Sequence, residues 1–174
     1  MATEEIALAL LPRRTIRESF DEVMRAHERM VLGTAFRLLG SMEDAQDAAQ
    51  EVFLRLLRNL SRIEGDPKAW LYRVTVNVCN DQFRKKIHAC EADEQRADPA
   101  PGPLALLDLD ERKRLLMEGL GTLAPREREA VVLRDIEGLS TREVAAILGV
   151  EEVTVRSHIS AARVKLAKYV RKRR

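Results

Sequence analysis

The segment Asp98-Pro-Ala-Pro-Gly-Pro103 constrains the fold of this chain more than any other. Proline lacks the backbone donor that a helix requires and clashes with the preceding turn, so a helix cannot continue through this run. Helical periodicity is also absent from residue 91 to residue 110. The segment therefore predicts a linker at residues 91–112. It separates a first module at residues 19–90, preceded by an N-terminal extension at residues 1–18, from a second module at residues 113–174.

Composition indicates that both modules are helical. Of the 174 residues, 45% are hydrophobic, as in folded proteins, but only 4% are aromatic. Residues that favour helices, such as Ala, Leu, Glu and Arg, dominate the sequence. The expected fold is all-α, with two small helical domains joined by a flexible linker.

The sequence carries no sign of export or membrane insertion. No stretch approaches the roughly 18 uncharged apolar residues that cross a bilayer, and Glu4 and Glu5 stand where a signal peptide would be basic. We therefore expect a cytoplasmic protein with no membrane insertion.

Charge is distributed unevenly along the chain, although the net charge is only +2. Residues 91–112 carry seven acidic and two basic side chains, whereas residues 125–174 carry 12 basic and seven acidic ones. An acidic connector followed by a basic module is typical of a protein that binds nucleic acid.

The two cysteines do not predict a metal or redox site. Cys79 and Cys90 lie in a chain without export signals, so a disulfide framework is not expected. His88 is close to Cys90, but three scattered ligands without a Cys-x-x-Cys pair are weak evidence for a metal. We expect a packed Cys79, incidental His88 and Cys90, and no cofactor.

The first two helices of the first module are predicted by their caps. Ser19 and Glu22 have capping-box spacing and open a helix that Gly40 ends. Ser41 and Asp44 open the second helix in the same way. Apolar residues at helical spacing form one buried stripe along this second helix: Ala45, Ala48, Ala49, Val52, Phe53, Leu56, Leu57 and Leu60.

A third helix is predicted from Asp66-Pro67 to about Ile87, because Asp is a frequent N-cap and proline fits the first helical position. Its apolar residues, Leu71, Val74 and Val78, lie about a third of a turn from a polar face. Four residues spaced 4, 3 and 4 apart share that polar face: Arg73, Asn77, Asn80 and Arg84. With Trp70 at its margin and Lys85 at its end, the face suits unstacked bases and phosphates. A solvated face with Trp70 in the core explains the same pattern.

The second module contains a predicted helix-turn-helix. Ser140 and Glu143 form a capping box, Gly149 suits the positive φ of a turn, and a second helix follows from about Glu152 to Tyr169. Apolar residues at helical spacing would be buried: Val144, Ala145, Ile147, Leu148, Val155, Ile159, Ala162 and Leu166.

In such a motif the second helix enters the major groove and its N-terminal residues reach base edges. Arg156 is the predicted base-reading residue, because arginine binds guanine through two hydrogen bonds. Polar and basic residues around it would contact bases or phosphates of the duplex: Arg142, Thr154, Ser157, Ser160, Arg163 and Lys165.

With both modules in view, the chain resembles the bacterial sigma factors, in particular the compact extracytoplasmic-function group. Asp44-Ala-Gln-Asp-Ala-Ala-Gln-Glu-Val-Phe53 is similar to the family's second-region helix, and Ala69-Trp-Leu-Tyr-Arg-Val-Thr-Val-Asn77 is similar to its promoter-melting helix. Leu123-Ala-Pro-Arg-Glu-Arg-Glu-Ala-Val-Val-Leu133 resembles the entry to its fourth region. The resemblance covers nearly everything after residue 18.

The resemblance implies a protein that binds core RNA polymerase, directs it to promoters and helps to open promoter DNA. The second-region helix would dock on the clamp coiled coil of the largest subunit through five residues: Asp44, Asp47, Gln50, Glu51 and Arg55. A second set would hold the downstream promoter element: Arg62, Lys68, Trp70, Arg73, Asn77, Asn80, Arg84 and Lys85. The helix-turn-helix residues named above would read the upstream promoter element. The family also implies a separate anti-sigma protein as a partner.

Two other classes of protein are compatible with a helix-turn-helix in a small helical chain. A stand-alone helix-turn-helix regulator would dimerise and bind a palindromic operator without polymerase. An α-helical adaptor or enzyme is less favoured, because the sequence has no Gly-rich phosphate loop, no convincing metal set and no nucleophile elbow. We therefore expect a protein that is not an enzyme.

Overall fold

The computed structural model describes residues 13–92 and 111–173, and these residues form helices joined by turns. The first module contains α2 (Arg13–Leu39), α3 (Met42–Asn59), the short 3-10 helix η1 (Leu60–Arg62) and α4 (Lys68–Ala92). The second contains α5 (Glu111–Gly121), α6 (Pro125–Val131), the π-helix η3 (Val132–Ile136), α7 (Thr141–Leu148) and α8 (Glu152–Lys172). The predicted all-α fold is confirmed for the described residues. Within them, no helix combines the length and the apolar character that a membrane span requires.

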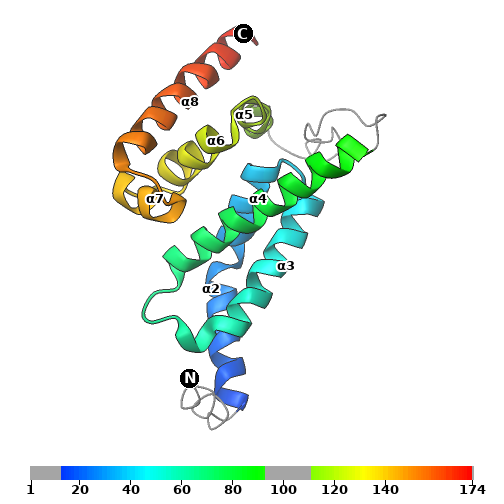
Figure 1. Cartoon of the computed structure of the whole chain (residues 1–174), viewed down its shortest axis with the longest axis vertical. Helices are drawn as coiled ribbons and strands as arrows, with labels where there is room; N and C mark the ends of the chain where they lie inside the picture. Colours follow the sequence, from blue (N-terminus) through cyan, green and yellow to red (C-terminus); the bar gives the residue numbers. More distant parts are fainter. Residues whose placement is uncertain (1–12, 93–110, 174) are drawn as a thin grey trace.

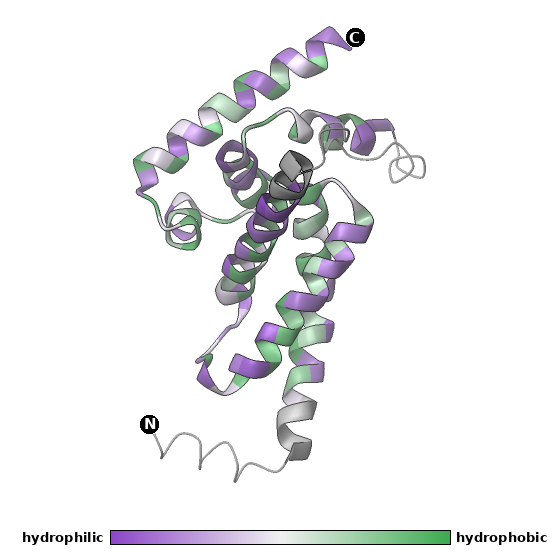
Figure 2. Ribbon diagram, turned by 45° about the vertical axis from the view of Figure 1, so that its right-hand side comes forward, coloured by the Kyte–Doolittle hydropathy of each residue, from purple (hydrophilic) through white to green (hydrophobic). Residues whose placement is uncertain are grey.

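The first module is a three-helix bundle in which α2, α3 and α4 pack side by side (Figure 1). Small residues of α3 let the helices approach closely, since Ala45, Ala48 and Val52 are fully buried. From α4, Leu71 and Tyr72 fill the same interior. The apolar stripes predicted on these helices therefore build the core, and Figure 2 shows hydrophobic residues recurring between hydrophilic ones along them.

The caps around Gly40 are confirmed. Gly40 ends α2 with a positive φ of 76°, which costs glycine little. The Ser41 side chain then accepts a hydrogen bond from the backbone N–H of Asp44 at 3.3 Å and starts α3. The predicted start at Ser19 is wrong, because α2 already begins at Arg13 and Ser19 lies inside it.

Two further details of the first module differ from the prediction. Leu57 was placed in the buried stripe of α3, but it is 46% exposed because the helix has turned that position to the outside. The third helix starts as expected, with the Asp66 carboxylate accepting a hydrogen bond from the Lys68 N–H at 2.9 Å. It then continues to Ala92, five residues beyond the predicted end at Ile87. Most of the predicted linker, residues 93–110, lies outside the described residues.

The helix-turn-helix of the second module is confirmed in its caps and its turn. Ser140 and Glu143 exchange the two hydrogen bonds of a capping box, at 2.7 and 3.2 Å. Gly149 ends α7 in the left-handed conformation, with a φ of 66°. In the following helix, Val155 and Ile159 are buried as expected. The predicted helix-turn-helix is therefore present in the structure.

The two modules pack against each other. Arg128 of α6 donates a hydrogen bond from Nη1 to the backbone carbonyl of Leu38 in α2, at 2.8 Å. Its other nitrogens donate to the carbonyls of Leu120, Gly121 and Leu123 in its own module. The buried residues of both modules form one continuous hydrophobic cluster. Sequence patterns predicted the modules but not this contact between them.

Candidate protein and nucleic-acid interfaces

The outward face of α3 carries the residues predicted to dock on a protein partner. Asp47 and Gln50 are exposed. Glu51 is half-buried and accepts a hydrogen bond from Arg55 Nε at 2.7 Å, one turn along the helix. Asp44 is less available, because its carboxylate forms an ion pair with Lys86 of α4. The available polar group is therefore centred on Asp47, Gln50 and Glu51.

Two leucines extend this face and were missed by sequence reasoning. Leu54 is 43% exposed and lies one turn beyond Gln50, and Leu57 continues the same side of α3. A polar group beside exposed leucines is typical of a protein interface, whose centre is apolar and whose rim is polar. The signal in the sequence was the spacing of Leu54 from Gln50, which places the two on one face.

The polar face of α4 is confirmed as a shared face. Arg73, Asn77 and Arg84 are exposed and Asn80 is half-buried. The Arg84 guanidinium binds Asp81 at 2.5 Å, one turn back on the same helix. Four basic residues lie exposed at or near the ends of this face: Arg62, Lys68, Lys85 and Lys86.

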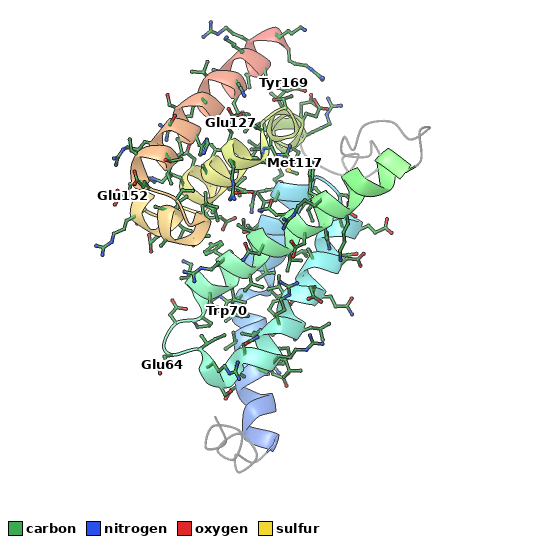
Figure 3. The ribbon with its side chains drawn as sticks, viewed as in Figure 1. Glu64, Trp70, Met117, Glu127, Glu152 and Tyr169 are labelled. Atoms are coloured by element: carbon green, nitrogen blue, oxygen red, sulfur yellow. The ribbon has the colours of Figure 1, made fainter. Side chains whose placement is uncertain are left out.

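Trp70 lies at the start of α4, beside the turn that carries Glu64 (Figure 3). It is half-buried and packs against the core, so it contributes to both the interior and the margin of the polar face. The placement of Trp70 at the margin of the face and its packing against the core are therefore both observed, and base binding there stays a prediction.

One end of this face opens into a cleft between the modules. The cleft has a volume of about 600 Å³. From the first module, Arg55, Asn77, Asn80 and Arg84 are among the residues that line it. Helix α6 of the second module supplies Pro125, Arg126 and Glu129 across from them. The residues predicted to meet an unpaired strand are thus partly faced by the second module.

The start of α8 presents the residues predicted to read duplex DNA. Arg156, Ser157 and Ser160 are exposed, and Thr154 is half-buried. Arg156 Nη1 lies 3.5 Å from Glu152 Oε2, one turn back on the helix. Glu152 is labelled at the beginning of α8 in Figure 3. On α7, Arg142 is exposed as well. These residues form one polar surface at the helix N-terminus, where base-reading residues of such motifs lie.

Two residues predicted to bind phosphates already have acidic partners. Arg163 donates to both carboxylate oxygens of Asp135, at 2.9 and 2.7 Å, which raises the pKa of its guanidinium. Lys165 donates to both oxygens of Glu127, at 2.8 and 2.7 Å, and this hydrogen bonding lowers the pKa of Glu127. These ion pairs brace α8 against α6 and η3. Sequence patterns could not show them, because the partners are 28 and 38 residues apart.

The described residues contain no group of three or more His, Cys, Asp and Glu side chains placed to hold a metal ion. Cys79 is buried in the core of the first module. Burial, with a smaller effect of the Glu129 charge, raises the pKa of its thiol to about 12. The expected packed Cys79 is confirmed, whereas the side chains of His88 and Cys90 lie outside the described part of the chain.

Both modules match known families. Residues 23–87 match the family described as Sigma-70 region 2, and residues 113–166 match the family described as Sigma-70, region 4. The ECF RNA polymerase sigma factor SigE of Mycolicibacterium smegmatis is 38% identical over 161 residues, which are 88% of this chain and 62% of that protein. The ECF RNA polymerase sigma factor SigM of Mycobacterium tuberculosis is 32% identical, with coverages of 87% and 77%. The RNA polymerase sigma-E factor of Streptomyces coelicolor is 33% identical, with coverages of 84% and 83%.

Solved structures share the fold. The sigma factor RpoE of Bartonella quintana, determined with the anti-sigma factor NepR, has a TM-score of 0.76 and 23% identity. The aligned region covers 90% of this chain and 99% of the RpoE chain. CnrH, determined in complex with the cytosolic domain of CnrY, has a TM-score of 0.67 and 28% identity, with 90% of each chain covered.

Proposed function

Because this chain belongs to the extracytoplasmic-function group of RNA polymerase sigma factors, which direct promoter-specific transcription, we propose that three of its surfaces divide the work. The face of α3 docks on core polymerase, the face of α4 holds an unpaired DNA strand, and α8 reads duplex DNA upstream. The observation that carries the proposal is the presence of three separate exposed faces, each on its own helix. The protein acts in the cytoplasm, where core polymerase is found, and has no catalytic role.

Helix α3 docks on the clamp coiled coil of the largest polymerase subunit. The exposed Asp47 and Gln50, beside exposed Leu54 and Leu57, support this role, because burial of the leucines adds apolar area at the centre of the contact. The double substitution Gln50→Ala and Glu51→Ala should reduce co-purification with core polymerase. The matched control is Glu28→Ala with Arg29→Ala, two exposed positions of α2. Equal recovery of both double variants would remove the docking assignment.

Helix α4 captures flipped bases of the non-template strand in the downstream promoter element. Asn77 and Asn80 offer amide groups to base edges or to the backbone, while Arg73, Arg84 and Lys85 supply positive charge for phosphates. Asn77→Ala with Asn80→Ala should slow promoter opening, measured as permanganate reactivity of unpaired thymines in the presence of core polymerase. Binding to core polymerase should be unchanged. Normal opening by this variant would contradict the assignment.

Helix α8 reads the upstream promoter element in the major groove, and Arg156 is its base-reading residue. Arg156→Ala should cost about 1–3 kcal/mol of binding at one upstream base position. The control is Arg171→Ala near the exposed end of α8, which should weaken binding evenly across sequences and reduce its salt dependence. In vitro transcription with core enzyme over a promoter library separates the two patterns. An unchanged sequence preference for Arg156→Ala would show that base reading lies elsewhere.

An anti-sigma protein is a further proposed partner. Two solved proteins of the same fold were determined with such a partner or with the cytosolic domain of another protein, and CnrH is 28% identical to this chain. An anti-sigma protein should compete with core polymerase for this chain in a pull-down experiment. The competing function, a dimeric operator-binding regulator, predicts tight DNA binding by the isolated chain, and the family match does not favour it.

A further inference from the structure

The outward face of α8 is defined by the residues that the helix buries. Val155, Ile159 and Ala162 are buried against the rest of the second module. At about 100° per residue, the opposite side of the helix carries four exposed residues spaced 4, 3 and 4 apart: Val153, Ser157, Ser160 and Val164. Arg156 lies about a quarter of a turn to one side of this line.

The two valines of this outward face are not explained by the core. Val153 is 58% exposed and Val164 is 53% exposed, and no other large hydrophobic side chain in the described residues is as exposed. Valine also has a reduced helix propensity, because its branched side chain loses rotamer freedom against the preceding turn. Neither burial nor helix propensity therefore accounts for an apolar side chain at these two positions.

The two valines differ in their place along the helix. Val153 is the second residue of α8, next to Glu152, which Figure 3 labels at the start of the helix. Val164 lies about three turns further along, roughly 16 Å away along the axis. When the second helix of such a motif enters the major groove, its N-terminal residues reach base edges. Val153 is therefore the apolar side chain of this face that lies where bases are read.

The surroundings of Val153 suit duplex DNA. Arg156 and Arg142 are exposed at this end of the motif, on α8 and α7. Glu152 Oε2 lies 3.5 Å from Arg156 Nη1, so the acidic group next to Val153 has a basic partner. Residues 125–174 carry 12 basic and seven acidic side chains. A protein interface is apolar at its centre, whereas one valine among polar and basic side chains fits a base edge in a charged duplex.

The major groove offers an apolar group at one base, because thymine carries a 5-methyl group. Cytosine and uracil lack this group. The two methyl groups of a valine pack against it without taking a hydrogen bond from any base. Burial of one such group corresponds to about a fourfold change in a binding constant. A single valine can therefore favour thymine over cytosine at one position.

We propose that Val153 is a specificity-determining residue of α8 that contacts the 5-methyl group of one thymine in the upstream promoter element. The inference rests on the proposed function of α8 as the duplex-reading helix. Val153 precedes Arg156 by about 4.5 Å along the axis, and successive base pairs are roughly 3.4 Å apart. This separation allows the arginine to read a guanine in one base pair and the valine a thymine in another.

Replacement of thymine by uracil tests the contact, because it removes the methyl group and keeps every hydrogen-bonding group of the base. The template is the promoter that the wild-type chain prefers in a transcription library with core polymerase. Each thymine of its upstream element is replaced in turn. For the wild-type chain with core polymerase, one replacement should weaken promoter binding about threefold. Val153→Ala should show no loss at that position, because its shorter side chain does not reach the methyl group.

The matched control is Val164→Ala, the same substitution on the same face of α8 but about three turns from Val153. It should keep the wild-type response to uracil. Circular dichroism should show equal helix content in both variants, since each side chain is exposed. An equal response to uracil in Val153→Ala and the wild type would overturn the proposal. A wild-type chain that responds to no uracil, or an upstream element without A·T pairs, would overturn it as well.

Arg156→Ala on the same templates separates this inference from the function proposed for α8. An altered base preference in Arg156→Ala, without any uracil response in the wild type, would keep α8 as the duplex-reading helix and contradict the role of Val153. An unchanged preference in Arg156→Ala, again without a uracil response, would contradict both. A uracil response that depends on Val153 would support both.

Discussion

At the scale of single residues, burial decides which groups are chemically available. Cys79 is a free thiol in α4, whose polar face is proposed to bind DNA, yet Cys79 itself is buried in the core. The sequence predicted this burial correctly, because Cys79 follows the apolar spacing of α4. The same reasoning could not predict that Arg163 and Lys165 are paired with acids, since each partner lies on another element.

The Cys79 thiol should not react with thiol reagents in the folded protein. A thiol whose pKa is raised to about 12 is almost fully protonated at pH 8, and the thiolate is the form that reacts. In a Cys90→Ser variant, where Cys79 is the single cysteine, Ellman's reagent should give no signal at pH 8 until denaturant is added. Stoichiometric reaction within seconds in native buffer would contradict the buried placement.

Tyr72 should make stability depend on alkaline pH. Burial first, and the charge of Glu137 second, raise the pKa of its phenol above the ordinary value of about 10. The protonated phenol is therefore favoured in the folded state. Its contribution to stability is complete below about pH 10 and is lost as the pH rises further. The free energy of unfolding, measured in urea from pH 8 to pH 11, should fall more steeply for the wild type than for Tyr72→Phe. Parallel curves would show that Tyr72 is not held protonated.

At the scale of elements, local signals predicted helix boundaries well where the cap and the turn agree. Gly40 with Ser41, and Ser140 with Gly149, all hold the predicted positions. The capping-box pattern at Ser19 failed because the same residues also occur inside helices, where no backbone donor is free to be capped. The π-helix η3 could not be predicted, since it contains no residue type specific to that geometry.

The capping box of α7 should contribute measurably to stability. Ser140→Ala removes the side-chain acceptor for the Glu143 N–H and should lower the free energy of unfolding by about 1 kcal/mol. Thr141→Ala, at the first helical position, is the control, because no capping bond of α7 uses its side chain. Guanidinium unfolding followed by circular dichroism measures both variants. Equal stability of Ser140→Ala and the wild type would mean that water replaces the Ser140 side chain as acceptor for the Glu143 N–H.

At the scale of the whole molecule, the linker predicted two modules, but their contact was invisible in the sequence. Glu137 accepts hydrogen bonds from Thr34 and Tyr72, which lie 103 and 65 residues away, and no local pattern connects them. The polar faces of α3, α4 and α8 were each predicted from helical spacing on a single element, whereas their proposed roles rest on the family resemblance as well. Their relation to one another depends on tertiary packing, which periodicity does not encode.

The continuous core predicts that the two modules unfold together. In scanning calorimetry the wild type should give one transition whose calorimetric enthalpy equals its van't Hoff enthalpy. Glu137→Gln weakens the contact between the modules and should raise the ratio of calorimetric to van't Hoff enthalpy above one. The Glu28→Gln control should keep the wild-type ratio. Two resolved transitions in the wild type would show that the modules are thermally independent.

The π-helix η3 makes the position of Glu137, and so its contact with the first module, depend on the number of residues in one turn. In η3 the Glu137 N–H bonds to the Val132 carbonyl five residues back, so the turn holds one residue more than an α-helix would. Deleting one residue there would restore the α-helical period and turn Glu137 by about 100° away from Thr34, Arg37 and Tyr72. The sequences of α4 and α8 would stay untouched. A single in-frame deletion in η3 would thus remove the hydrogen bonds that Thr34, Arg37 and Tyr72 donate to Glu137.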